Sequence, residues 1–184
     1  MPHIDLPSDS YGIVGALNAY PQTGQPLRAL AEALLRGPSS LSMAERELIA
    51  TRVSAGNECQ FCTQSHASIA RHLLGDQRSV VDDLLAGDAQ VDDRLAALLA
   101  IADKVRRDGR LVATDDIERA RAAGADDQAI HDTVLIAAAF CMFNRYVDGL
   151  ATRTPTDLSQ YHAWGERTAR EGYLKEVDRI TPSA

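Results

Sequence analysis

The chain has 184 residues, of which 45% are hydrophobic and 24% are charged, and its formal net charge is −7. These values are typical of one globular domain. Because the chain contains no basic stripe and no run of about 18 apolar residues, neither nucleic acid nor a membrane is expected as a partner.

Alanine is abundant and aromatic residues are scarce, with 29 Ala, 3 Phe and 1 Trp. This composition favours closely packed helices over a β-sandwich. No strand pattern and no internal repeat is evident. We therefore predict an all-α fold, a single-domain helical bundle of about seven to nine helices.

The predicted elements begin with an N-terminal arm over residues 1–24, which includes one short helix around residues 11–18. A helix follows over residues 26–36, and Gly37-Pro38 ends it. The all-α catalytic domain is expected to cover residues 25–173. Residues 174–184 are expected to form a C-terminal tail.

The strongest start signal is a capping box, in which Ser42 is the N-cap and Glu45 the third helical residue. The helix that it opens is predicted to end near Gly56. The later helices are predicted at 58–74, 78–86, 92–107, 115–123 (capped by Thr114), 129–150 (opened by Asp126) and 157–173. The segment 129–150 is the most apolar and is expected to be the central buried helix.

The cysteine pattern argues against a disulfide framework, since the count is odd and two of the three lie at Cys59 and Cys62. No signal peptide is visible at the start. A reducing, cytoplasmic setting is therefore expected, where such a pair is reactive or binds a metal. Cys141 lies in the apolar segment and is predicted to be a buried structural thiol.

Helical spacing places Cys59, Cys62 and His66 on one face, within about 60° of arc. An imidazole one turn after Cys62 can accept its thiol proton. The first helical turn also lowers a thiol pKa, an effect that favours the earlier Cys59. If the two helices pack antiparallel, Glu47 approaches His66 and raises its basicity.

Two other readings of this cluster remain open. Cys59, Cys62 and His66 supply three zinc ligands, although no fourth is nearby, because His72 lies on another face. The pair can also serve a helical oligomer that senses redox state with little turnover. The remaining histidines, His3, His72, His131 and His162, are expected to form no cluster.

The order Glu47, Cys59-x-x-Cys62, His66 resembles the alkylhydroperoxidase D-like family of the carboxymuconolactone decarboxylase-like superfamily. The later part of the chain resembles the peroxidase-related branch of this superfamily at two stretches, Phe143-Asn144-Arg145 and Asp148-Gly149-Leu150. The whole resemblance covers about residues 25–155. The resemblance implies an all-α thiol peroxidase without metal or organic cofactor. It assigns Cys62 as the thiol that attacks a hydroperoxide, Cys59 as the resolving thiol, and Glu47 with His66 as a proton relay.

The resemblance also implies a reductant that is a dithiol or a redox protein, and a homo-oligomer, with a hexamer as first choice and a trimer or dimer next. Asn144 is expected at a subunit contact or a helix end. Phe61 stands where some members carry a His, so the relay lacks that imidazole. A lactone decarboxylase, like other members of the superfamily, is a less favoured alternative because its chemistry needs no dithiol.

Overall fold

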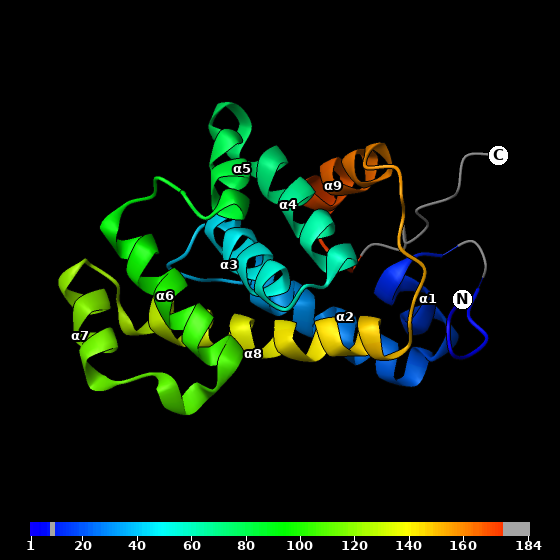
Figure 1. The fold of residues 1–184 in the computed structure, drawn as a ribbon, viewed down its shortest axis with the longest axis horizontal. Coiled ribbons are helices and arrows are strands. Elements are labelled where there is room, and N and C mark those ends of the chain that lie inside the picture. The colour runs from blue at the N-terminus through cyan, green and yellow to red at the C-terminus, as the bar shows by residue number, and fades with distance from the viewer. Residues whose placement is uncertain (8–9, 175–184) are drawn as a thin grey trace.

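The computed structural model describes residues 1–7 and 10–174 and shows nine α-helices, two short 3₁₀ helices and no strand over these residues (Figure 1). This confirms the predicted all-α fold. The α-helices are α1 (Gly12–Ala19), α2 (Pro21–Arg36), α3 (Met43–Gly56), α4 (Gln60–Leu74), α5 (Ser79–Ala86), α6 (Asp93–Arg107), α7 (Thr114–Ala122), α8 (Asp127–Gly149) and α9 (Ser159–Glu171). In the part of the chain that the structure describes, none of them is long and apolar enough to cross a membrane.

The N-terminal segment is more helical than predicted, since α2 begins at Pro21 rather than at Pro26. Proline suits the first position of a helix because its fixed φ is already helical and its missing N–H has no partner there. Pro26 then lies inside α2, where only one backbone hydrogen bond is lost. Most of the segment after Tyr11 that was expected to be irregular is therefore helical.

The capping box at the start of α3 is confirmed in both directions. Ser42 Oγ accepts a hydrogen bond from Glu45 N at 3.2 Å, and Ser42 N donates to Glu45 Oε2 at 2.8 Å. From this start α3 packs against α4, α6 and α8, and most of its residues are buried. The prediction that 129–150 is the central helix is therefore only partly right: α8 buries one face but exposes Leu135 and Met142.

Two helix starts differ from the prediction by a residue or two. Cys59 has extended backbone angles and is the N-cap of α4, so it precedes the helical residues rather than lying among them. Thr114 is the first residue of α7 rather than its cap. There Asp116 Oδ2 accepts a hydrogen bond from Ala113 N at 2.8 Å and takes the place of a capping side chain.

The last helix, α9, lies across α4, which brings the end of the described chain back to the middle of the fold (Figure 1). The two helices approach closely at Gly165, where an added Cβ would lie 2.3 Å from Ser68 Oγ. Gly172 then ends α9 with a φ of +79°, in the left-handed region that favours glycine. Tyr173 follows this turn, and of the predicted tail only Leu174 lies within the described residues.

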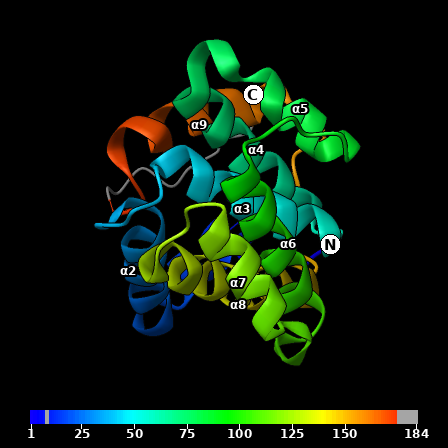
Figure 2. The same ribbon diagram turned by 90° about the vertical axis from the view of Figure 1, so that its left-hand side faces the viewer.

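The molecule has two dissimilar ends. Helices α6 and α7 form one end, whereas α1 and α9 lie toward the other (Figures 1 and 2). The Cys-x-x-Cys segment belongs to the second end, in an apolar cluster separate from the main core. The members of this cluster are Tyr11, Cys59, Phe61, Cys62, Ile69, Val147, Tyr161 and Trp164.

Candidate active site

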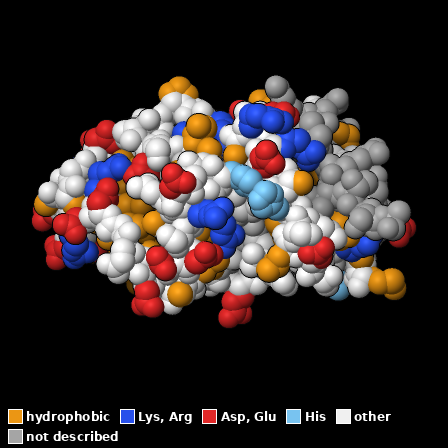
Figure 3. Space-filling view, turned by 90° about the horizontal axis from the view of Figure 1, so that it is seen from above, with side chains coloured by type: hydrophobic (Ala, Val, Ile, Leu, Met, Phe, Trp, Pro, Cys, Tyr) orange, Lys and Arg blue, Asp and Glu red, His pale blue; other side chains and the backbone are white. Residues whose placement is uncertain are grey.

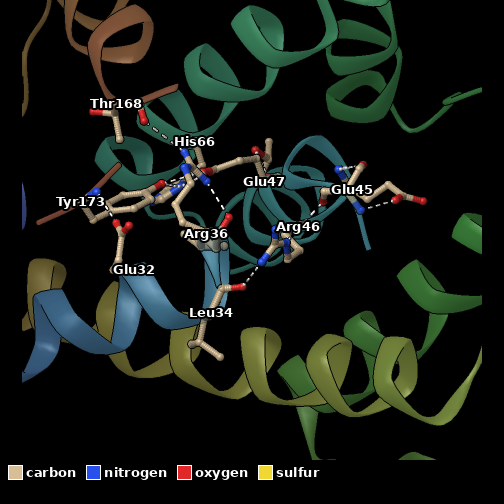
Figure 4. A network of polar contacts seen from close by, with 12 residues as sticks. Glu32, Leu34, Arg36, Glu45, Arg46, Glu47, His66, Thr168 and Tyr173 are labelled. Carbon is tan, nitrogen blue, oxygen red and sulfur yellow. Dashed lines mark hydrogen bonds and ion pairs between the residues drawn. The ribbon is translucent and has the colours of Figure 1, made fainter. Parts of the chain in front are cut away.

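Glu47 and His66 are in direct contact, as the sequence predicted. Helices α3 and α4 lie side by side, and His66 Nδ1 is 2.7 Å from Glu47 Oε2 (Figure 4). The Glu47 side chain is completely buried and the His66 side chain is 11% exposed. A buried carboxylate on Nδ1 fixes the imidazole and leaves Nε2 available to another group.

Two further groups hold the other carboxylate oxygen of Glu47. Arg36 Nη1 lies 2.8 Å from Oε1, and the Tyr173 hydroxyl donates to the same oxygen at 2.7 Å (Figure 4). Burial by itself raises the pKa of a carboxyl group, but the contacts with His66, Arg36 and Tyr173 outweigh it, so the pKa of Glu47 lies below its ordinary value. Glu47 is therefore an anion at neutral pH.

Arg36 and Tyr173 were not predicted as site residues. The Arg36 guanidinium lies 4.9 Å from the Tyr173 ring centroid, and Tyr173 N donates to Glu32 Oε2 at 2.6 Å. Burial, together with the charge of Glu47, raises the pKa of Tyr173 well above its ordinary value, so its hydroxyl remains a donor. The only local signal was a basic residue in the last turn of α2, which a helix dipole alone explains.

A second arginine holds the backbone on either side of Arg36. Arg46 of α3 donates from Nη1 to the carbonyl oxygens of Leu34, at 3.2 Å, and of Gly37, at 2.8 Å. These bonds use carbonyls that the end of α2 leaves without helical partners. They attach the end of α2 to α3, beside Glu47 (Figure 4).

Both thiols of the Cys-x-x-Cys segment are free and buried: Cys59 is 0% exposed and Cys62 is 3% exposed. A hydrogen bond with Cys59, then burial, raises the pKa of Cys62 well above its ordinary value. The expectation that the start of the helix lowers the thiol pKa is therefore wrong for Cys62. Its thiol needs a base to become a nucleophile.

Asn144 is a neighbour of Cys62 that works in the opposite direction. Its hydrogen bond lowers the pKa of Cys62, although less than Cys59 and burial raise it. Asn144 is 1% exposed, donates to Ser54 Oγ at 3.1 Å and accepts from Asn57 Nδ2 at 2.9 Å. It was expected at a subunit contact or a helix end, and it lies instead inside the fold, beside the thiol.

A cavity of about 80 Å³ opens onto this cluster. That is space enough for a peroxide group. Cys62, Ser65 and His66 of α4 line it, whereas Cys59 is not among the lining residues. Its remaining walls are largely apolar and come from α1, α2, α8 and α9. A molecule in the cavity therefore meets Cys62 before Cys59.

Comparison with known proteins identifies the family. The model of the carboxymuconolactone decarboxylase family matches residues 21–104. An uncharacterized peroxidase-related protein from Silicibacter sp. TM1040, whose crystal structure is known, is 30% identical in sequence to this chain. The match covers 80% of this chain and 78% of that protein, with a TM-score of 0.72. The chain belongs to the alkylhydroperoxidase D-like and carboxymuconolactone decarboxylase-like superfamily.

Two other solved structures of the superfamily fold are similar. An uncharacterized peroxidase-related protein from Ralstonia eutropha JMP134, described as an alkylhydroperoxidase core, is 27% identical over 83% of this chain and 79% of its own, with a TM-score of 0.74. A protein of unknown function from Agrobacterium tumefaciens is 22% identical over 79% of this chain and 99% of its own, with a TM-score of 0.68. At this level of identity the similarity shows the fold alone. A comparison with curated proteins finds no match.

In this member of the superfamily, Cys141 lies outside the site and is partly exposed rather than buried. Its sulfur lies 3.6 Å from Asn57 Nδ2 and 3.7 Å from the Arg106 carbonyl oxygen. The residue is partly exposed because it lies at the edge of the exposed face of α8.

The histidine prediction also needs a correction, because His72 and His162 are in edge-to-face contact with ring centroids 4.6 Å apart. Figure 3, which views the molecule from above Figure 1, shows histidine side chains exposed near the middle of that face. Over residues 1–7 and 10–174, no group of three or more His, Cys, Asp or Glu is arranged to hold a metal ion. The zinc alternative thus finds no ligand set in the described chain.

Proposed function

We propose that the protein is a thiol-dependent peroxidase that reduces hydroperoxides through Cys62 and Cys59. The observation that carries the proposal is the arrangement of Cys62 and His66 on one small cavity, with the buried anion of Glu47 behind His66. Cys59 is enclosed beside Cys62, where a resolving thiol is needed. Membership of the superfamily supports the same reading.

The first step is activation of the Cys62 thiol. Its raised pKa keeps it protonated at neutral pH, so a base must take the proton as the reaction proceeds. Because Glu47 accepts a hydrogen bond from the Nδ1–H of His66, Nε2 is the free basic nitrogen. The charge of Glu47 stabilises the imidazolium that forms.

The second step transfers oxygen. The Cys62 thiolate attacks one peroxide oxygen, an S–O bond forms, and the O–O bond breaks with its electron pair on the leaving oxygen. His66 returns the proton to that oxygen, which gives an alcohol and a Cys62 sulfenic acid. Cys59 then attacks the Cys62 sulfur, a disulfide forms and water leaves. A dithiol or redox protein reduces the disulfide by exchange.

Phe61 stands where some members of the superfamily carry a His, so the proposed proton relay has the imidazole of His66 and lacks a second one at this position. Its ring lies 6.1 Å from that of Tyr161, and a Cβ added to Gly12 would lie 2.2 Å from it. Phe61 therefore fills the space between α4, α9 and α1 and forms part of the cavity wall. Proton transfer is left to His66 and Glu47, with Arg36 and Tyr173 behind them.

The test is hydroperoxide consumption with dithiothreitol as the supplied dithiol. We expect Cys62→Ser to abolish turnover. With the reduced protein and no dithiothreitol, Cys59→Ser should consume one equivalent of hydroperoxide and stop at the Cys62 sulfenic acid, whereas the parent should stop at the disulfide. Cys141→Ser should match the parent in both assays. Equal turnover in all three variants would overturn the proposal. One equivalent of oxidation in the parent without turnover by dithiothreitol or thioredoxin would indicate a redox sensor instead.

We also propose that the chain self-associates, with a hexamer as first choice and a trimer or dimer next. Leu135 and Met142, 39% and 42% exposed, lie two turns apart on the outer face of α8. Such apolar side chains at one helix face suit contact with a second copy. Light scattering across a range of concentrations tests this, and a monomer throughout would contradict it.

A further inference from the structure

Ser65 carries a buried hydroxyl at the cavity that has no partner among the described residues. The residue is 1% exposed and lines the cavity together with Cys62 and His66. Among the described residues, no group forms a hydrogen bond with Ser65 Oγ. A buried hydroxyl left without a partner is destabilising, so its retention at this position calls for a reason.

Three buried threonines on helices behave differently, although the buried Tyr161 hydroxyl of α9 is also without a partner among the described residues. Thr51, Thr63 and Thr133 each donate to the carbonyl oxygen four residues earlier, at 2.7–2.8 Å. This local bond is the usual solution for a hydroxyl inside a helix. Ser65 Oγ does not bond the carbonyl one turn back, and its donor is left at the cavity wall.

Helix geometry puts this donor beside the reacting sulfur. Ser65 follows Cys62 by three residues and His66 follows it by four, so their directions differ from that of Cys62 by about 60° on one side and about 40° on the other. Residues at these spacings are neighbours on a helix surface. The cavity floor therefore presents a thiol with an imidazole on one flank and a hydroxyl on the other.

We propose that the Ser65 hydroxyl donates a hydrogen bond to the leaving oxygen of the hydroperoxide, an inference that rests on the proposed function. As the Cys62 sulfur bonds to one oxygen and the O–O bond breaks, negative charge develops on the other oxygen. Ser65 stabilises that charge, and His66 then supplies the proton. A donor aimed at developing charge in a water-poor site accelerates such a step.

The experiment measures the second-order rate of thiol oxidation when reduced protein is mixed with tert-butyl hydroperoxide. We expect Ser65→Ala to lower this rate by about 10- to 100-fold. Ser65→Thr, which keeps a hydroxyl, should recover most of the rate. Ser68→Ala is the matched control, because Ser68 is a buried serine one turn later whose Oγ donates to Tyr161 O at 2.9 Å.

Two further measurements separate a chemical role from a structural one. Removing a buried unpaired hydroxyl should leave the melting temperature of Ser65→Ala equal to or above that of the parent, whereas Ser68→Ala should lower it. Alkylation of Cys62 by iodoacetamide has no leaving peroxide oxygen and should be unchanged in Ser65→Ala.

The outcomes distinguish the two proposals. A parent that oxidises with the hydroperoxide while Ser65→Ala keeps the same rate would overturn the role of Ser65 alone. An equal fall in the rates of oxidation and alkylation would also overturn it, since the variant would then affect the thiol rather than the leaving group. A parent that does not react with the hydroperoxide would overturn the proposed function as well.

Discussion

Cys62 and Cys141 are thiols in opposite settings. Cys62 is buried at the wall of a small cavity, beside an imidazole that contacts a buried carboxylate. Cys141 is partly exposed on α8, and its sulfur contacts a side-chain amide and a backbone carbonyl. Asn57 connects the two settings, because its Nδ2 contacts both the Cys141 sulfur and Asn144, the neighbour of Cys62.

This difference separates access from activation. A reagent that needs only access reaches Cys141 more easily, because Cys141 is partly exposed whereas Cys62 is buried. In the proposed function, a small peroxide that needs a thiolate and a proton donor reacts at Cys62, beside the contact between His66 and Glu47. The rate of Cys62 oxidation by a hydroperoxide, divided by the rate of Cys141 alkylation, therefore measures how much the proton relay contributes.

The largest change in that ratio is expected from Glu47→Gln. The amide removes the charge that stabilises protonated His66 and leaves the buried Arg36 without its counter-ion. We expect oxidation of Cys62 by tert-butyl hydroperoxide to slow about 100-fold, while alkylation of Cys141 stays unchanged. Loss of one partner of a buried ion pair should also cost about 3–5 kcal/mol in the free energy of unfolding.

Asp116→Asn is the control for this variant. Asp116 is a buried carboxylate far from the cavity residues, its pKa lowered to about 2 by a hydrogen bond from Lys104 and by others from Ala113 N and Arg119. Its loss should lower stability but leave the rate of Cys62 oxidation as in the parent. Equal slowing in both variants would mean that Glu47 acts on the fold and not on the thiol.

The part of the site that the sequence predicted lies on two helices that are consecutive in the chain. Helical phase places Cys62 and His66 on one face, and a short connection after α3 makes it the neighbour of α4, which brings Glu47 into reach. The capping box fixed the start of α3 and thereby the phase of Glu47. Local rules were sufficient for these positions.

The rest of the site comes from segments that only the packed fold brings together. Tyr173 and Glu47 are 126 residues apart in sequence, and Asn57 and Asn144 are 87 apart. No spacing pattern relates such pairs. The sign of the pKa shift at Cys62 was missed for a related reason: the helix start favours a thiolate, but the hydrogen bond with Cys59 and burial outweigh it, and the depth of burial is not visible in a helical pattern.

A smaller change is expected from the thiol pair itself. The contact with Cys59 is the largest cause of the raised pKa of Cys62, so Cys59→Ala should move the pH midpoint of Cys62 alkylation to lower pH and increase its rate at pH 7. The midpoint is measured with iodoacetamide and mass spectrometry between pH 6 and 10. Cys141→Ala is the control and should leave the midpoint where it is. An unmoved midpoint in Cys59→Ala would show that burial alone determines it.

The same shift links stability to alkaline pH. A thiol whose pKa is higher in the folded state holds its proton more tightly there, so the stabilisation is complete below the unfolded value of about 8.5 and is lost as the pH rises through the folded value. The parent should therefore lose stability above about pH 8.5. Cys59→Ala should lose less over the same range, as measured by urea unfolding.

The smallest effect is expected from Tyr173→Phe, which removes one of the hydrogen bonds on Glu47 and keeps the ring beside Arg36. Loss of one such bond corresponds to about 1 kcal/mol, or roughly a fivefold slower oxidation of Cys62. The pKa of Glu47 should move up toward its ordinary value. A carboxyl whose pKa is lowered in the folded state stabilises the protein above its unfolded-state pKa of about 4.3. This stabilisation is lost as the pH falls through the folded-state pKa, so Tyr173→Phe should lose less stability in acid than the parent.

Melting temperatures between pH 6 and pH 3 measure that difference, with Tyr20→Phe as the control because Tyr20 is 50% exposed and outside the site. If the melting temperature falls by the same amount between pH 6 and pH 3 in Tyr173→Phe and in the parent, Arg36 and His66 alone hold Glu47 ionised. If Tyr173→Phe changes the fall in melting temperature at acid pH but not the rate of Cys62 oxidation, the pKa of Glu47 does not determine that rate. In that case the relay would depend on the contact between His66 and Glu47 and not on the groups behind it.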